Sequence, residues 1–391
     1  MGYKVDFYRH SVGEAELESI RETVDGLFLA LGPRVGEFEC RVVVVLCRGK
    51  RLEERLADFL DIEHVVGTSS CSMSLILALR ALDIGEGDEV ITTPMTFASS
   101  SNAVLHVGAD LVFADIDPAT GLLDPDRVEE AITDKTRAII PVHLYGQLAD
   151  MRAFRRIADK HDLHVIEDAA HAVESRRDGY RTGELGDIAT FSFYATKNMT
   201  SGDGGALACH SEQIARRLSQ LRNHGISKDA ASRHGGGYEH WDMLELGYKA
   251  PMTDIEAAML LPQLEHLEAR RERRQRLVER YEELLADRND VGLVEWTGTS
   301  AHHLFTVQVP EGSRDAVLTG LGERGIGCTV NYRAVHTLDY YRRELGYEPQ
   351  DFPEANRFGR RTVSLPLWPD LPPEQVGIVV DELCDTLDSL E

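Results

Sequence analysis

The stretch from residue 64 to residue 168 alternates short apolar runs with segments of helical spacing, and this pattern restricts the chain to few folds. Repeated strand-then-helix units indicate a mostly parallel sheet that helices cover on both faces. In such sheets ligands bind beyond the carboxyl ends of the strands. We therefore predict an α/β fold with its chemistry at strand ends. The expected strands are 64–68, 89–93, 111–116, 138–144 and 164–167, and the expected helices are 72–82, 98–106, 125–132 and 151–160.

Composition and charge narrow the class of protein. The 391 residues are 42% hydrophobic and carry a formal net charge of −24. This acidity disfavours nonspecific binding to nucleic acid or to anionic membranes. No apolar run approaches the length of a membrane span, and the first residues lack a signal-peptide core, so a cytoplasmic enzyme is expected. The cysteines show no zinc-like spacing, so we predict reduced thiols and no metal site; they are Cys40, Cys47, Cys71, Cys209, Cys328 and Cys384.

A change of pattern near residue 253 predicts a domain boundary. Thr253 to Glu256 form a capping box, which opens a charged helix that we expect to reach Ala286. Beyond it the pattern predicts a strand over 304–309, a helix over 314–324, a strand over 327–332 and a helix from Pro373. We therefore predict a large α/β domain over residues 1–252, and a connecting helix with a smaller α+β domain over residues 253–391.

The N-terminal region contains an anomaly at residues 40–53. A helix is expected over 13–28, with Leu17, Ile20, Val24 and Leu27 at helical spacing and Gly32-Pro33 ending it. The segments on either side of 40–53 would join into one amphipathic helix with Phe38, Leu56, Phe59 and Leu60 on one face. The intervening residues resemble a short strand, a turn over 48–50 and a return. We therefore predict that 40–53 is a surface excursion or a disordered loop.

Lys197 is the first candidate for catalysis. The strand-like run that ends at Tyr194 leads directly to this lysine, and a glycine-rich turn follows it. A lysine just beyond a buried strand has its amine near a cleft, where desolvation lowers its pKa and favours Schiff-base chemistry. The alternative is a solvated lysine in a turn, so the other strand ends must decide.

Three further strand ends carry residues that suit pyridoxal phosphate (PLP). Residues 68–72 place Ser70, Cys71 and Ser72 at a helix N-terminus that can bind a phosphate, although capping alone would explain the serines. Asp168 ends an apolar strand and can pair with a protonated pyridine nitrogen, or cap a helix. Ser192 can donate to the phosphate. Phe97 can stack on the ring, or belong to the core.

These motifs together resemble the DegT/DnrJ/EryC1/StrS family of sugar aminotransferases, which has the aspartate-aminotransferase-like fold type I. The resemblance covers almost the whole chain, and its motifs follow one another in the order that the family has. These motifs are Gly32-Pro33, 70–75, 92–97, 141–146, 167–171, 191–198, 221–225, 246–249, 252–255 and 364–367.

The resemblance implies roles for these residues. Lys197 would form the Schiff base with PLP, Asp168 would pair with the ring nitrogen and His171 would lie near the ring hydroxyl. Phe97 would stack on the ring, and Ser70, Cys71, Ser72 and Ser192 would hold the phosphate. The family acts as a homodimer with sites at the interface, and Lys249 would reach the partner's phosphate, although many members have Asn there and Ala250-Pro251 departs from the usual pattern. The implied substrate-binding residues are Tyr8, His303, Tyr332, Arg333 and His336, with a surface position as the alternative for Arg333.

The implied reaction is a transamination from L-glutamate to a keto group of a nucleotide-linked deoxysugar, in amino-sugar biosynthesis. Alternatives on the same scaffold are amination of a cyclitol or another cyclic ketone, and a deoxygenating dehydratase. Lys197 argues against the dehydratases, because those relatives carry His at that position. A non-catalytic regulator of the same fold is an alternative of another class.

Overall fold

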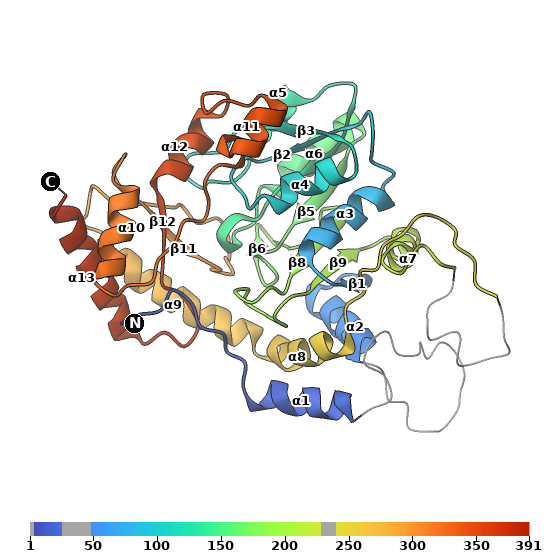
Figure 1. Ribbon diagram of the computed structural model, residues 1–391, viewed down its shortest axis with the longest axis horizontal. Helices are drawn as coiled ribbons and strands as arrows, with labels where there is room; N and C mark the ends of the chain where they lie inside the picture. Colours follow the sequence, from blue (N-terminus) through green and yellow to red (C-terminus); the bar gives the residue numbers. More distant parts are fainter. Residues whose placement is uncertain (1–3, 26–47, 228–239, 391) are drawn as a thin grey trace.

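A seven-stranded sheet forms the centre of the computed structural model, which describes residues 4–25, 48–227 and 240–390 (Figure 1). Its strands are β1 His64–Thr68, β2 Glu89–Thr92, β3 Asp110–Phe113, β4 Thr136–Ile140, β5 His164–Asp168, β8 Ile188–Ser192 and β9 Gly205–Cys209. They lie in the order β1-β9-β8-β5-β4-β2-β3. Strand β9 is antiparallel to β1 and β8, and the other neighbours are parallel. The predicted mostly parallel α/β sheet is confirmed.

Helices cover both faces of this sheet, which explains why its strands are apolar at consecutive positions. In β2, Val90 packs into the core on one face and Ile91 into the core on the other. Ile140 and Ile139 of β4 divide in the same way, because successive side chains of a strand point to opposite faces. One face is covered by α3 Cys71–Ala81, α4 Ser99–His106 and α7 Glu212–Leu221, and the other by α2 Arg48–Leu60, α5 Pro125–Ala131, α6 Met151–His161 and α8 Asp254–Glu265.

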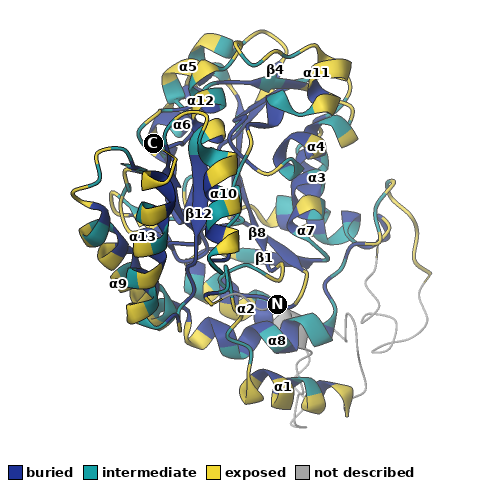
Figure 2. Cartoon of the chain, turned by 60° about the vertical axis from the view of Figure 1, so that its left-hand side comes forward, coloured by how far each residue is buried: buried dark blue, intermediate teal, exposed yellow. Residues whose placement is uncertain are grey.

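The C-terminal part builds a second core around a three-stranded antiparallel sheet. Its strands are β10 Gly292–Leu293, β11 Phe305–Gln308 and β12 Thr362–Leu365. Helices α9 Leu267–Leu285, α10 Arg314–Glu323 and α13 Pro373–Asp388 pack against them. Both sheets are buried, and the exposed residues lie on the outer faces of the helices and in the loops (Figure 2). Apart from the helix near the N-terminus, the remaining elements are the hairpin strands β6 Arg176–Arg177 and β7 Tyr180–Arg181, and the helices η1 Leu144–Gly146, η2 Val335–Thr337, α11 Asp339–Leu345 and α12 Pro353–Arg361.

The predicted strand over 327–332 is wrong. Thr329 forms one isolated bridge with Ser364 of β12, while the Gly327 amide donates to the Val5 carbonyl at 2.8 Å. Because this segment divides its hydrogen bonds between two partners, it builds no continuous ladder with either. The strand next to β11 is instead β12. The predicted strand 304–309 and the helices at 314–324 and from Pro373 are confirmed within a few residues.

The predicted capping box is present, but the helix that it opens is interrupted. Thr253 Oγ1 accepts from the Glu256 amide at 3.2 Å, and the Thr253 amide donates to Glu256 Oε2 at 2.6 Å. The helical path breaks at His266, whose φ of −108° and ψ of 2° separate α8 from α9. The domain boundary between residues 252 and 253 stays a prediction.

Helix α1, Glu14–Val24, forms where the sequence predicts a helix but does not bury the predicted face. Leu17 is 46% exposed and Val24 56% exposed. The buried residues of α1 are Glu16, Ser19 and Thr23. Leu27 and the Gly32-Pro33 pair lie outside the described residues.

The prediction for residues 40–53 is wrong over the part that the structure describes. Residues 48–53 form the first turns of α2 rather than a turn and a return strand. Leu52, Leu56 and Leu60 recur at intervals of four and are all buried against α8 and β1. This apolar stripe is the physical reason for the helix. Residues 40–47 lie outside the described part.

Two further observations bear on the composition-based expectations. Among the described helices, none is long and apolar enough to cross a lipid bilayer. Cys71, Cys209, Cys328 and Cys384 are free thiols, and Cys40 and Cys47 lie outside the described residues.

The buried stripe of α2 generates a test of this correction. Leu52 is 2% exposed, so Leu52→Ala should lower the free energy of unfolding by about 2–5 kcal/mol. The matched control Leu17→Ala removes an exposed leucine and should change it by less than about 0.5 kcal/mol. Denaturant unfolding measures both. Equal effects of the two substitutions would restore the surface-loop interpretation.

Candidate active site

Neighbouring strands β5 and β8 bring the predicted carboxylate and the predicted amine to the same end of the sheet. Strand β5 ends at Asp168, whose register partner in β8 is Thr190. Strand β8 ends at Ser192, and the chain then turns through Lys197. The Asp168 carboxylate and the Lys197 amine are close enough to interact electrostatically. The strand pairing therefore creates the acid–amine pair that the sequence predicts.

Asp168 is buried and held in a defined orientation. Ser100 Oγ donates to its Oδ2 at 2.7 Å, and the Ala170 amide donates to its Oδ1 at 3.2 Å. Its main chain is bonded to Pro141 and His143, each at 3.0 Å. The element that follows Asp168 in the chain is strand β6, and the next described helix is α7 at Glu212, so the alternative of a helix cap does not apply.

Lys197 is half-buried, and its amine has no hydrogen-bond or ion-pair partner within the described parts of the chain. Its amide donates to the Tyr194 carbonyl at 2.9 Å, which fixes the turn. Burial lowers the pKa of Lys197 to about 8, and the Asp168 charge acts in the opposite direction. More of the amine is therefore neutral near physiological pH than for an ordinary lysine.

His171 lies beside this pair as an uncharged ring. The Tyr145 amide donates to Nδ1 at 3.3 Å, so the neutral ring carries its proton on Nε2 and donates to Tyr332 Oη at 3.1 Å. Its ring also lies against that of His303, with centroids 4.4 Å apart. Burial is the main cause that holds the pKa of His171 well below its usual value, and the charge of Lys197 is the second cause.

The residues predicted to hold a phosphate surround the start of α3. Ser70 caps this helix by accepting from the Met73 amide at 3.2 Å, which matches the capping alternative but leaves its own O–H group to donate. Ser72 is exposed, and its hydroxyl lies 2.6 Å from that of Ser99. The Cys71 thiol is turned inward toward Thr190, which leaves its main chain as the part that can face a ligand.

Ser192 is oriented by the chain that follows it. Its hydroxyl oxygen accepts from the Tyr194 amide at 3.4 Å, and its O–H is left to donate. Ser192 pairs with Gly205 of β9, and a Cβ at Gly205 would lie 2.5 Å from the carbonyl carbon of Ser70. The missing side chain therefore allows the start of α3 to approach the sheet this closely.

Phe97 has the exposure expected of a ring that contacts a ligand rather than the core. It is 62% exposed, which excludes the core alternative. Its ring centroid lies 6.1 Å from that of Tyr332, the residue that binds His171. Phe97, Tyr332 and His171 therefore form a connected aromatic group.

Three predicted residues are not brought to this group. His336 is fully buried, with its ring edge-on to Phe352 at 5.1 Å and its Nε2 3.5 Å from the Pro349 carbonyl. This environment favours a packing role. Arg333 and Lys249 are exposed, and the contacts predicted for them, with the substrate and with the partner's phosphate, stay predictions.

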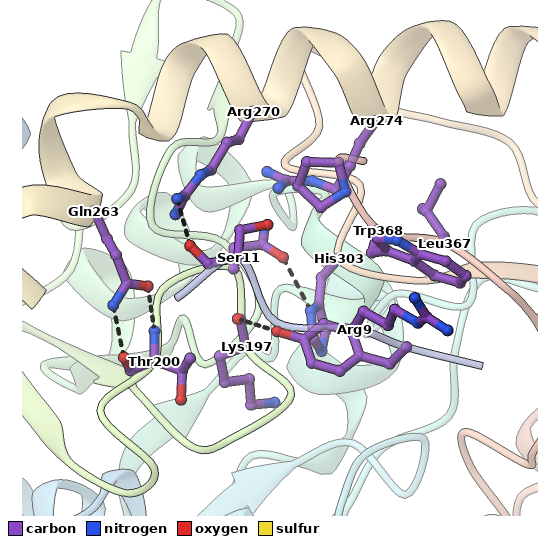
Figure 3. A pocket seen from close by; sticks show the side chains of 13 residues that line it. Arg9, Ser11, Lys197, Thr200, Gln263, Arg270, Arg274, His303, Leu367 and Trp368 are labelled. Atoms are coloured by element: carbon purple, nitrogen blue, oxygen red, sulfur yellow. Dashed lines mark hydrogen bonds between the residues drawn. The ribbon is translucent and has the colours of Figure 1, made fainter. Parts of the chain in front are cut away.

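A pocket beside Lys197 brings the predicted Tyr8 and His303 together with residues that the sequence analysis did not assign to the site, such as Asn198 (Figure 3). Tyr8 donates to the Lys197 carbonyl at 3.2 Å, and His303 donates to Asn198 Oδ1 at 3.2 Å. Asn198 Nδ2 in turn donates to Glu174 Oε1 at 2.8 Å. Because Asn198 directly follows Lys197 in the sequence, its place near the site could have been predicted from the sequence. The pocket is lined by Tyr8, Arg9, Ser11, Lys197, Asn198, Thr200, Gln263, Arg270, Arg274, His303, Leu367, Trp368 and Pro369.

Comparison with known proteins identifies the family. The family model of the DegT/DnrJ/EryC1/StrS aminotransferase family matches residues 47–384. The chain belongs to this family. It is 38% identical over 384 residues to the spore coat polysaccharide biosynthesis protein SpsC of Bacillus subtilis. The matched region covers 96% of this chain and 95% of SpsC.

Two solved structures relate this DegT/DnrJ/EryC1/StrS aminotransferase to proteins with bound cofactor. The PMP-form of Spr1654 from Streptococcus pneumoniae, named as a sugar aminotransferase, is 29% identical with a TM-score of 0.90 and covers 99% of this chain and 100% of that chain. DesV of S. venezuelae, solved with a ketimine intermediate, is 35% identical with a TM-score of 0.84, and the match covers 95% of this chain and 94% of DesV. The predicted fold, enzyme class and PLP cofactor are confirmed.

The residues of the site fit PLP by their chemistry. The unpartnered Lys197 amine suits an aldehyde, and the buried Asp168 carboxylate suits a protonated ring nitrogen. The exposed Phe97 ring offers a face for stacking. Ser72, Ser192 and the N-terminus of α3 offer donors to a phosphate. The role of each residue stays a prediction.

The lowered pKa of Lys197 predicts a pH profile for its reactivity. Acetic anhydride reacts only with neutral amines, so labelling of Lys197 in cofactor-free protein should rise about tenfold per pH unit and level off near pH 8. Asp168→Asn removes a charge that raises this pKa and should move the midpoint to lower pH. Mass spectrometry of the labelled peptide gives both values. A midpoint near the ordinary lysine value of about 10.4 would contradict the argument.

The close approach at Gly205 predicts a defect in cofactor binding. In Gly205→Ala the new Cβ would lie 2.6 Å from the Cys71 nitrogen, so the start of α3 must shift. Overpacking of this kind costs about 1–3 kcal/mol, and we expect PLP affinity to fall about tenfold. Gly322→Ala, at a site with no atom within 4 Å, should bind PLP normally. Titration of the cofactor-free variants with PLP measures both affinities. Equal affinities would contradict the phosphate site predicted at the start of α3.

Proposed function

We propose that this enzyme transfers the amino group of L-glutamate to a keto group of a nucleotide-linked deoxysugar, in amino-sugar biosynthesis. The observation that carries the proposal is the unpartnered, half-buried Lys197 amine next to the oriented Asp168 carboxylate. The name of SpsC refers to polysaccharide biosynthesis, and Spr1654 is named as a sugar aminotransferase. These names support a sugar rather than a free amino acid as the acceptor.

The residues of the chain have distinct tasks in this reaction. When bound, PLP supplies an aldehyde that condenses with amines and a ring that withdraws electrons from the α-carbon of the donor. The Lys197 amine removes the proton from that α-carbon, which its pKa of about 8 allows. Asp168 keeps a proton on the ring nitrogen through its carboxylate. His171 stays neutral and adds no charge beside Lys197.

A homodimer is part of the proposal. Phe97, whose ring lies near Tyr332, and Tyr194, which precedes Lys197 in the same turn, are 62% and 52% exposed. Further apolar side chains are exposed at Met243, Leu244 and Leu246. Exposed apolar surface next to a site supports contact with a second copy of the chain. Lys249 would then contact the partner's cofactor phosphate.

A half-reaction and an acceptor panel test this function. L-Glutamate should change the absorbance of the bound cofactor, and mass spectrometry should detect an aminated product from one member of a panel of nucleotide keto-sugars. Lys197→Ala should reduce turnover by about 10²–10⁴-fold or more, because it removes the group that moves the proton. Lys135→Ala, at an exposed lysine between α5 and β4, serves as the matched control.

The panel also includes cyclitol-type and other cyclic ketones. Amination of these, with no reaction of any nucleotide sugar, would replace the sugar proposal. Full activity of Lys197→Ala would remove the role assigned to the lysine.

A further inference from the structure

Helix α9 directs two arginines toward the pocket beside Lys197 (Figure 3). Arg270 and Arg274 lie four residues apart and therefore share one face of the helix. Tyr8 and Ser11 of the N-terminal segment line the same pocket. The charges of Arg274 and Arg270 both act on the Tyr8 hydroxyl, whose pKa burial raises to about 12. The basic side chains therefore converge near the predicted catalytic lysine.

Arg274 is almost fully buried but incompletely bonded. Its Nη2 pairs with Glu174, and its Nε donates to the Ala301 carbonyl at 2.9 Å. Its Nη1 has no hydrogen-bond partner among the described residues. A buried donor without a partner is costly, and a ligand acceptor in the pocket would remove that cost.

Arg270 adds a positive charge that no carboxylate neutralises within the described parts of the chain. It is half-buried, and its one described side-chain hydrogen bond runs from Nη2 to the Ser11 carbonyl at 2.8 Å. The amine of Lys197 is likewise unpaired. In a chain with a formal net charge of −24, such a local excess of positive charge is unusual. It points to an anionic ligand, since arginine binds carboxylates and phosphates strongly.

We propose that Arg270 and Arg274 form the subsite for a carboxylate of the amino donor. This inference rests on the proposed function, because it assigns the donor of that reaction to a place in the site. Leu367, Trp368 and Pro369 form an apolar wall suited to the methylene groups of a dicarboxylate. Arg270 and the unpartnered Nη1 of Arg274 are the charged donors for this carboxylate.

The position of the pocket beside Lys197 favours a small dicarboxylate over a nucleotide diphosphate. Its lining includes Lys197 itself, so a carboxylate held there lies beside the predicted catalytic lysine, where the proposed reaction places the amino donor. In a sugar nucleotide, by contrast, the sugar ring separates the diphosphate from the keto group that the proposed reaction aminates.

Glutarate is the probe that tests this subsite, because it has the carbon chain of glutamate but no amino group to react. Calorimetry on the PLP-loaded full chain should show that Arg270→Gln weakens glutarate binding at least tenfold, and that Arg270→Lys weakens it less. The matched control Arg276→Gln, at an exposed position of the same helix, should stay within twofold of the unchanged protein. The affinities for UDP and dTDP should stay within twofold in all variants.

The outcomes separate this inference from the proposed function. Unchanged glutarate affinity in Arg270→Gln, or no glutarate binding to the unchanged protein, would overturn the subsite. A loss of UDP or dTDP affinity, alone or together with glutarate, would overturn it in favour of a diphosphate or a general anion site. The half-reaction of the unchanged protein with L-glutamate is measured in parallel. If that reaction is absent the proposed function fails, whereas if it is present and Arg270→Gln binds glutarate normally, only the subsite fails.

Discussion

The parallel pairing of β5 with β8 is the constraint on which the site depends. Its register sets Asp168 opposite Thr190, so a carboxylate stands at the end of the sheet from which the chain continues to Lys197. The antiparallel return through β9 then places Gly205 beneath the start of α3. One stretch of sheet thus assembles a carboxylate, an amine and a helix N-terminus, the three groups that suit PLP.

Burial then decides the charges of this group. Removal from water lowers the pKa of Lys197, while the nearby Asp168 limits the shift. The same effect keeps His171 and His303 uncharged, so neither ring adds to the repulsion on the lysine. Arg274 remains paired through Glu174. The result is an amine with a lowered pKa beside a pocket that carries positive charge, although the chain as a whole is strongly acidic.

Predictions from the sequence succeeded where a local pattern had one meaning. Strands buried on both faces must be apolar at consecutive positions, as Val90 and Ile91 are, and their ends follow from the helices between them. Asp168 and Ser192 could be placed at strand ends for that reason. The prediction failed at 48–53. The valine-rich run before this segment and its Gly49 favour a strand and a turn, whereas the leucines from Leu52 onward recur at helical spacing. The prediction also failed at 327–332, whose hydrogen bonds go to two distant segments.

The sequence by itself determined most of the order of strands and helices and the family, and it predicted the catalytic lysine and its carboxylate partner. These depend on residue type and local spacing, which the chain carries explicitly. The tertiary structure alone decided which side chains share a pocket. It buried His336 among aromatic rings and turned Arg270 and Arg274, two members of a highly charged helix, toward Lys197. Such directions depend on how distant elements pack against each other, and no local pattern records that packing.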